Sequence, residues 1–134
     1  MLRPFYDKMI WTHAPLIYAA WRCYKKRRIE MGTLTTTMIA LSIFYHRHKE
    51  SIPMLNFIEN SMGRLFSIYA VLHAIKCKHH KMQKIELVLM FIGYFIYYSA
   101  GYGHVDYEKW HWLNHVWPAT WLIILIEKHD GIFI

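Results

Sequence analysis

The feature that most constrains the fold of this chain is the separation of its charged residues from long apolar stretches. Of the 134 residues, 55% are hydrophobic and only 19% are charged. A soluble domain of this size would have difficulty hiding so much apolar surface. Charges clustered between apolar segments are typical of multi-pass membrane proteins. The sequence therefore predicts an all-α, multi-pass transmembrane helical bundle that forms one membrane domain over residues 1–134.

Four apolar segments divide the chain, and a fifth carries polar interruptions. The four predicted spans cover about residues 31–46, 53–75, 85–103 and 111–126. They are too long for barrel strands and lack strict alternation, so helices are expected. The further segment 9–21 contains Thr12, His13 and Pro15. It could be a short span, a signal anchor or an interfacial helix, so the bundle is expected to have four to five helices.

The basic residues orient these segments. The formal net charge is +7, and the loops 22–28 and 76–84 hold more Lys and Arg than the links 47–51 and 104–110. The positive-inside rule places the two basic loops on the cytoplasmic-type side of a membrane. No nucleic-acid-binding motif accompanies the charge, so we expect no nucleic acid partner. Anionic lipid headgroups are the expected partners of the basic loops.

This topology brings polar residues from distant segments to a similar depth. Segments 31–46 and 85–103 end on the outer side, and segments 53–75 and 111–126 begin there. Six polar residues should therefore lie in the outer half of the bundle: His46, Glu59, Asn60, His104, His111 and His115. Ionisable side chains at membrane depth are costly, which makes them candidates for a functional site.

Three of these residues have the spacing of a metal site. His111 and His115 are four residues apart and share one helix face, which suits two imidazoles that bind one metal. His46 would be the third ligand and would leave a fourth position for water. Three ligands and a water form the catalytic zinc arrangement, in which the pKa of the water falls to about 7. Alternatively, the histidines accompany the neighbouring tryptophans in an interfacial aromatic belt.

Two short motifs give the chain a family resemblance. The segment Ser42-Ile-Phe-Tyr-His46 matches an S-x-x-x-H signature, and His111-Trp-Leu-Asn-His115 matches H-x-x-x-H. In this order and near the helix ends, the two motifs resemble those of the CREST membrane hydrolases, which include alkaline ceramidases, progestin and adiponectin receptors and myomaker-like proteins. The resemblance implies zinc bound by His46, His111 and His115, with Ser42 assisting. It also implies a seven-helix bundle and, by analogy with the ceramidases, cleavage of a lipid amide.

The chain departs from that family in two ways. It has four or five predicted helices instead of seven. The family's Asp should fall at Asn60, three residues before Gly63. The nearby carboxylate, Glu59, lies about 100° round the helix. Glu59 and Asn60 are therefore both candidates for the catalytic position, and without the Asp the chain could bind metal without catalysis. Arg64, in the same segment, is a candidate buried charge for a carboxylate, a lipid headgroup or a partner subunit.

The sequence leads to one main functional hypothesis and two alternatives. The main hypothesis is a zinc-binding integral membrane protein that hydrolyses a lipid amide or ester bond, as ceramidases do. The first alternative is a small non-catalytic accessory subunit that packs against other subunits of a larger membrane complex. The second is a b-type membrane protein with a single haem held by facing histidines.

Overall fold

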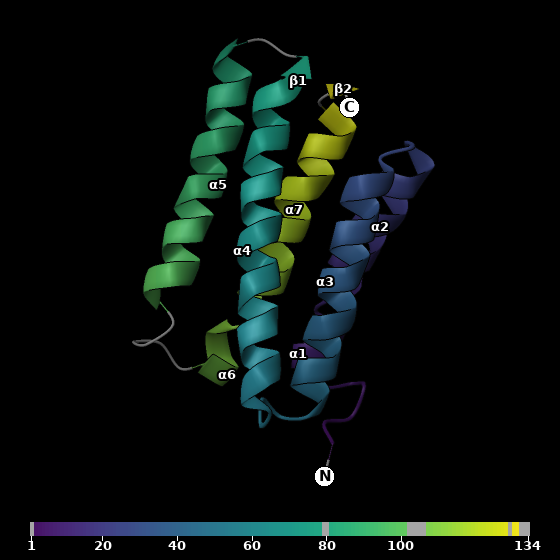
Figure 1. The fold of residues 1–134 in the computed structure, drawn as a ribbon, viewed down its shortest axis with the longest axis vertical. Helices are drawn as coiled ribbons and strands as arrows, with labels where there is room; N and C mark the ends of the chain where they lie inside the picture. The colour runs from purple at the N-terminus through teal and green to yellow at the C-terminus, as the bar shows by residue number, and fades with distance from the viewer. Residues whose placement is uncertain (1, 79–80, 102–106, 129, 132–134) are drawn as a thin grey trace.

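The structure is a computed structural model that describes residues 2–78, 81–101, 107–128 and 130–131. Helices make up most of it, with one short antiparallel strand pair (Figure 1). The elements in chain order are α1 (Lys8–Trp11), α2 (Ala14–Lys25), α3 (Ile29–Arg47), α4 (Pro53–Lys76), β1 (Cys77–Lys78), α5 (Lys81–Gly101), α6 (Tyr107–Trp110), α7 (Leu113–Lys128) and β2 (Asp130–Gly131). The predicted all-α class is confirmed.

The predicted helix positions agree closely with these bounds for α3 and α4, and α7 is shifted two residues towards the C-terminus. Helix α5 begins four residues before the predicted segment 85–103, whose last two residues lie outside the described part. The uncertain segment 9–21 is two helices, α1 and α2, with a break at Thr12 and His13. Within the described residues, no helix combines the length and apolar character needed to cross a membrane.

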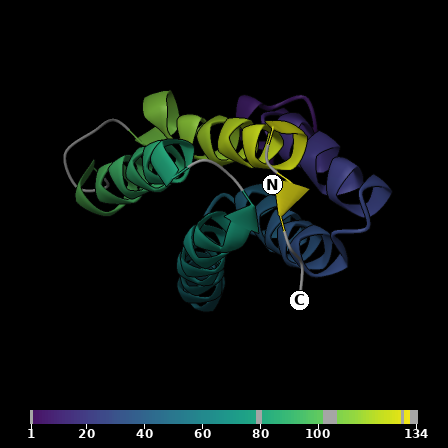
Figure 2. The ribbon, with the colours of Figure 1, turned by 90° about the horizontal axis from the view of Figure 1, so that it is seen from above.

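The five long helices form a closed ring. Each one packs against two others, in the cyclic order α2, α3, α4, α5 and α7 (Figure 2). Large side chains fill the ring, among them the buried Trp121, Phe66 and Phe91. The indole Nε1 of Trp121 donates to the carbonyl oxygen of Leu87 at 3.1 Å, which satisfies its polar atom inside the core. Because the ring is closed, residues from α2, α3, α4 and α7 can meet at one end.

The helix ends that carry the predicted site residues lie together. The C-terminal end of α3, the start of α4, and helices α1 and α6 occupy one end of the molecule (Figure 1). The α2–α3 turn and the strand pair occupy the opposite end. The described residues that were predicted to share one depth therefore lie at one end of the bundle, and His104 lies outside the described residues.

Three residues of the basic loop 22–28 fasten α2 to the C-terminal end of α7. The Arg28 guanidinium donates to the carbonyl oxygen of Leu125 at 3.2 Å, and Lys26 Nζ donates to that of Ile126 at 3.1 Å. Cations are favourable at a helix C-terminus because its free carbonyls carry partial negative charge. Arg22 also donates two hydrogen bonds, of 2.5 and 2.9 Å, to the carboxylate of Glu127. These contacts hold α2 in place beside α7.

Candidate metal centre

The three histidines of the two motifs meet in the interior. His46 lies near the end of α3, His111 in the turn between α6 and α7, and His115 at the start of α7, and all three are buried. The Nε2 atoms of His46 and His111 are 3.1 Å apart. The rings of His46 and His115 have centroids 5.2 Å apart, and those of His111 and His115 are 5.1 Å apart. The structure thus brings together the three imidazoles predicted as metal ligands.

Of the two candidates on α4, Glu59 faces this cluster and Asn60 does not. The carboxylate Oε1 of Glu59 accepts a 2.5 Å hydrogen bond from Ser42 Oγ and lies 3.4 Å from His46 Nε2. The Asn60 amide instead donates to Asn56 Oδ1 on the same helix. Consecutive helical residues point about 100° apart, so only one of the two can face α3. The predicted use of Asn60 at the carboxylate position does not fit this orientation.

Contacts around the cluster decide which ring nitrogen carries the proton in two histidines. The Nδ1 atom of His46 lies 2.7 Å from Glu50 Oε1, so Nδ1 is the donor in this pair, while Nε2 faces Glu59 Oε1 at 3.4 Å. The Nδ1 atom of His115 lies 2.8 Å from Thr12 Oγ1. Because Thr12 already donates its hydroxyl hydrogen to the carbonyl oxygen of Lys8, His115 must donate here. Both rings therefore turn Nε2 away from the Nδ1 contact, and in the neutral ring this nitrogen carries the lone pair that binds a metal.

His111 is held differently. The Asn114 amide Nδ2 lies 3.4 Å from its Nδ1, while Asn114 Oδ1 is buried without a hydrogen-bond partner among the described residues. In this arrangement Nδ1 accepts, so Nε2 carries the hydrogen that points at His46. A half-turn of the amide would put Oδ1 against Nδ1 and move the proton there. That single rotation would satisfy Oδ1 and free the His111 Nε2 lone pair for a metal.

Glu50 occupies a position that costs backbone energy. Its φ of 56° lies in the left-handed region, as does that of Lys49 at 53°, and such residues persist where the surroundings over-determine them. Its carboxylate contacts both His46 Nδ1 and, at 3.0 Å, Arg3 Nη2. Burial raises the pKa of Glu50, but the hydrogen bonds from His46 and Arg3 outweigh it and bring the pKa below its ordinary value. The ionised carboxylate holds the His46 ring in a fixed orientation.

A fourth histidine, which neither motif includes, belongs to the same cluster. His13 precedes α2 and is 1% exposed, and its ring centroid is 3.8 Å from that of His115. Ligand atoms of His13, His46 and His115 lie within 4.8 Å of one another, and so do those of His46, Glu59 and His111. The available signal in the sequence was an ionisable residue inside the apolar segment 9–21.

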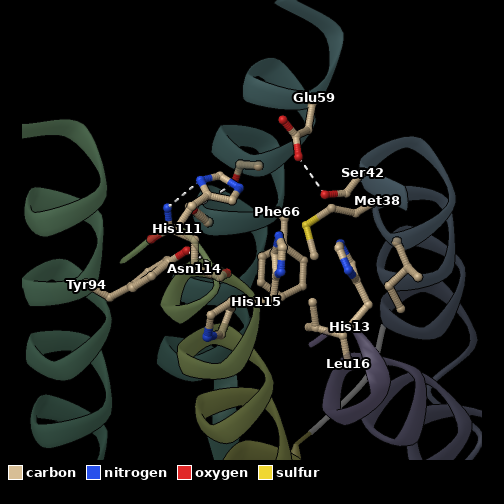
Figure 3. Close-up of a pocket in the computed structure, with 14 residues that line it drawn as sticks. His13, Leu16, Met38, Ser42, Glu59, Phe66, Tyr94, His111, Asn114 and His115 are labelled. Atoms are coloured by element: carbon tan, nitrogen blue, oxygen red, sulfur yellow. Dashed lines mark hydrogen bonds between the residues drawn. The ribbon is translucent and has the colours of Figure 1, made fainter. Parts of the chain in front are cut away.

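The cluster borders a small, partly open cavity of about 50 Å³ (Figure 3). Its walls come from several helices, and Leu16, Met38 and Phe66 provide much of the apolar surface. Figure 3 shows Ser42 and Glu59 on one side of this space and His111 with Asn114 on another. A cavity of this size can hold a metal ion or a few waters, since a water needs roughly 10–15 Å³ of such volume.

The prediction of a buried charge at Arg64 is wrong. Arg64 is exposed on α4 and does not line the cavity. It follows Glu59 by five residues and therefore points about 140° away from it. The inner face of α4 is occupied instead by Glu59, Phe66 and Ala70. Arg64 faces outward because the helix turns it away from the ring.

The sequence matches no protein-family model. Comparison with curated proteins and with solved structures also finds no significant relative. The resemblance to the CREST hydrolases thus stays a prediction that rests on the two motifs. The case for function depends on the geometry of the cluster.

Proposed function

We propose that this protein binds zinc through His46, His111 and His115 and hydrolyses an amide or ester bond of a membrane lipid. One observation carries the proposal. His111 and His115 line a small cavity together with Glu59 and Ser42, whose side chains are hydrogen-bonded to each other. His46, from the other motif, lies beside it, with its Nε2 3.1 Å from His111 Nε2 and 3.4 Å from Glu59 Oε1. This is the residue set that zinc-dependent hydrolysis requires.

The chemistry of the donors fits zinc. Imidazole nitrogens on a tetrahedral zinc lie about 3.3 Å apart, given Zn–N distances of about 2.0–2.1 Å, and the Nε2 atoms of His46 and His111 are 3.1 Å apart. The Nε2 atom of His115 is buried and has no hydrogen-bond partner among the described residues. A buried polar atom left unpaired costs about 1–3 kcal/mol. A metal ion would remove that cost.

The residues divide the work of hydrolysis between them. The three imidazoles fix the metal, which when bound acidifies water and polarises a carbonyl. Glu59 would take a proton from the attacking water as its oxygen bonds to the carbonyl carbon, and then pass that proton to the leaving amine or alcohol as the C–N or C–O bond breaks. Ser42 is a positioning residue, because its hydroxyl holds the Glu59 carboxylate at 2.5 Å.

A lipid substrate is supported by an apolar groove beside the cavity. The groove has a volume of about 680 Å³ and is lined by Met90, Gly93, Tyr94, Trp110, Leu113 and Trp117. Tyr94 lines both the groove and the small cavity. An acyl chain could therefore lie in the groove while its carbonyl reaches the histidines.

A membrane location is supported by the outer faces of α4 and α5. These faces expose large apolar side chains: Leu65, Ile68, Leu72 and Ile75 on α4, and Met82, Ile85, Leu89, Ile92 and Ile96 on α5. Contiguous apolar surface of this kind typically contacts lipid or a partner protein. We propose that these faces contact membrane lipid, with the exposed basic residues Lys25 and Arg27 near anionic headgroups.

The size of the cavity argues against the haem alternative. Cofactor pockets usually exceed roughly 300 Å³, and the space among the histidines is about 50 Å³. A macrocycle would also have to separate imidazoles that are now in contact.

The test uses the full chain purified in detergent. Elemental analysis should find one zinc per chain. Glu59→Gln should keep the zinc and lower hydrolysis of long-chain acyl amides and esters by about 10²–10⁴-fold. Asn60→Ala, the matched change one residue along, should leave both unchanged.

Three results would count against the proposal. Folded protein that takes up no zinc at neutral pH contradicts it entirely. Zinc binding without hydrolysis of any acyl amide or ester would remove the enzymatic part. Isolation in a stable heteromeric complex whose function survives replacement of Ser42, His46 or His115 would favour the accessory-subunit alternative.

A further inference from the structure

His13 is part of the cavity wall although it belongs to neither motif. It lies in the two-residue break between α1 and α2, where Pro15 starts the second helix. Its ring packs against His115 at 3.8 Å between centroids and lies 5.8 Å from His46. The N-terminal segment thus places an imidazole against two of the proposed zinc ligands.

The backbone sets the protonation of this ring. The Nδ1 atom of His13 lies 3.0 Å from the carbonyl oxygen of Ile10, which can only accept, so Nδ1 carries the hydrogen. The Nε2 atom therefore holds a lone pair. It is buried and has no hydrogen-bond partner among the described residues. A backbone carbonyl that orients an imidazole through its far nitrogen is a common arrangement in metal-binding histidines.

The surroundings of the His13 ring favour a metal ion shared with its neighbours over a histidine that only packs in the core. Among the described residues, neither His13 Nε2 nor His115 Nε2 has a hydrogen-bond partner, although both atoms are buried. Their ligand atoms lie within 4.8 Å of each other and of that of His46. A shared tetrahedral zinc would need these nitrogens to close to about 3.3 Å. His111 joins the group through His46, whose Nε2 lies 3.1 Å from His111 Nε2.

We propose that His13 is the fourth ligand of the metal, so that the resting site is closed by four imidazoles: His13, His46, His111 and His115. This inference rests on the zinc binding proposed above and adds a regulation to it. A tetrahedral site with four protein ligands is structural, whereas a catalytic site keeps one position open. Hydrolysis then requires His13 to dissociate from the metal, so that water can take its coordination position. A movement of the N-terminal segment at the break between α1 and α2 would withdraw the His13 ring.

The charges around the cluster are consistent with a site made of neutral imidazoles. Four imidazoles leave the full charge of a divalent ion uncompensated. Glu50 lies against His46 Nδ1, and Glu59 lies 3.4 Å from His46 Nε2. These two carboxylates supply negative charge that compensates the metal ion, and neither takes the coordination position assigned to His13.

Cobalt substitution tests the proposal, because the visible absorption of Co²⁺ depends on its ligands. The full chain is purified in detergent, stripped of metal and titrated with Co²⁺. The wild type should bind one Co²⁺, and thiocyanate should not change its spectrum. His13→Ala should bind more weakly, with a shifted spectrum that responds to thiocyanate. Added imidazole should restore the original spectrum.

Two further variants make the result decisive. His48→Ala is the matched control, since the His48 side chain bonds to the carbonyl oxygen of Phe44 outside the cavity. It should behave as the wild type. His13→Gln retains a polar side chain of similar length and guards against a loss of folding, which circular dichroism would reveal.

The outcomes separate the two proposals. If the wild type binds Co²⁺ and both His13 variants show its affinity, spectrum and resistance to thiocyanate, the fourth-ligand inference is overturned while the zinc site stands. If the folded wild type binds no metal, both fail. If only the His13 variants respond to thiocyanate, the closed site is supported.

Discussion

At the scale of single residues, the candidate site depends on groups that bind no metal themselves. Glu50, Thr12 and the Ile10 carbonyl each accept from the Nδ1 of one histidine. Each contact fixes a ring and leaves its Nε2 facing the cluster. Outer contacts of this kind orient metal ligands and raise their basicity. The position of Thr12, directly before His13, ties two of these contacts to one short stretch of chain.

Replacing Thr12 by valine should weaken zinc binding without disturbing the fold. The change keeps the shape of the side chain but removes the acceptor that orients His115. We expect the affinity to fall by about 10–100-fold, measured by competition with a coloured chelator. Thr37→Val is the control, because Thr37 is exposed on α3 and its hydroxyl donates to the Thr33 carbonyl on the same helix. Equal affinities for the two variants would contradict the role assigned to Thr12.

The sequence predicted most of the site because two motifs of five residues each carried it. Ser42 and His46 are four apart on α3, which helix geometry places on one face. His111 lies two residues before α7, so its position beside His115 depends on the turn between α6 and α7. His13 could not be found this way, because its role depends on how α2 packs against α7. The choice of Glu59 over Asn60 depended on the rotation of α4, which a pattern of largely apolar residues leaves undetermined.

At the scale of helices, α7 shows how a proline is accommodated next to the site. Pro118 has no N–H, so the carbonyl of Asn114, four residues earlier, loses its helical hydrogen bond. The hydroxyl of Tyr94 on α5 donates to that carbonyl at 3.1 Å. The gap in α7 therefore becomes a link between α5 and α7, at the residue that also contacts His111.

Replacing Tyr94 by phenylalanine should destabilise the protein by about 1 kcal/mol, because the Asn114 carbonyl loses its donor. The cost should shrink in a Pro118→Ala background, where the restored amide at position 118 can bond to the same carbonyl. Denaturant unfolding of the four proteins of this double-mutant cycle measures the coupling. Tyr6→Phe, on an exposed side chain, controls for loss of a phenol hydroxyl. Additive effects of the two changes would show that the hydrogen bond does not compensate for the proline.

The helices themselves could be predicted because their apolar runs are long and bounded by charges. From the sequence, the basic loop 22–28 is expected only to set the orientation in a membrane and to contact lipid headgroups. In the structure Arg22, Lys26 and Arg28 bind the C-terminal end of α7. These partners are about a hundred residues away along the chain, and local patterns carry no information on such contacts. The same loop can serve both purposes, since Lys25 and Arg27 remain exposed.

At the scale of the whole molecule, the ring closes through a contact between helices that are distant in sequence. The pairs α2–α3, α3–α4 and α4–α5 are sequential, whereas α7 packs between α5 and α2. The candidate ligands come from the helices on either side of the α2–α7 contact and from α3. His13, His46 and His115 come from α2, α3 and α7 or their ends, while α4 and α5 contribute no histidine to the cluster. A bound metal would therefore cross-link one side of the ring.

Removing the metal should loosen that side of the ring and leave the other intact. A ligand that binds only the folded state stabilises it by about 2.7 kcal/mol at a free concentration one hundred times its Kd. A chelator should therefore lower the melting temperature of the wild type. It should also speed hydrogen exchange at the start of α2 and of α7 more than in the middle of α4. A variant with both His46→Ala and His115→Ala should not respond to the chelator. An unchanged melting temperature in the wild type, or faster exchange spread evenly over all helices, would show that the histidines do not join these elements through a metal.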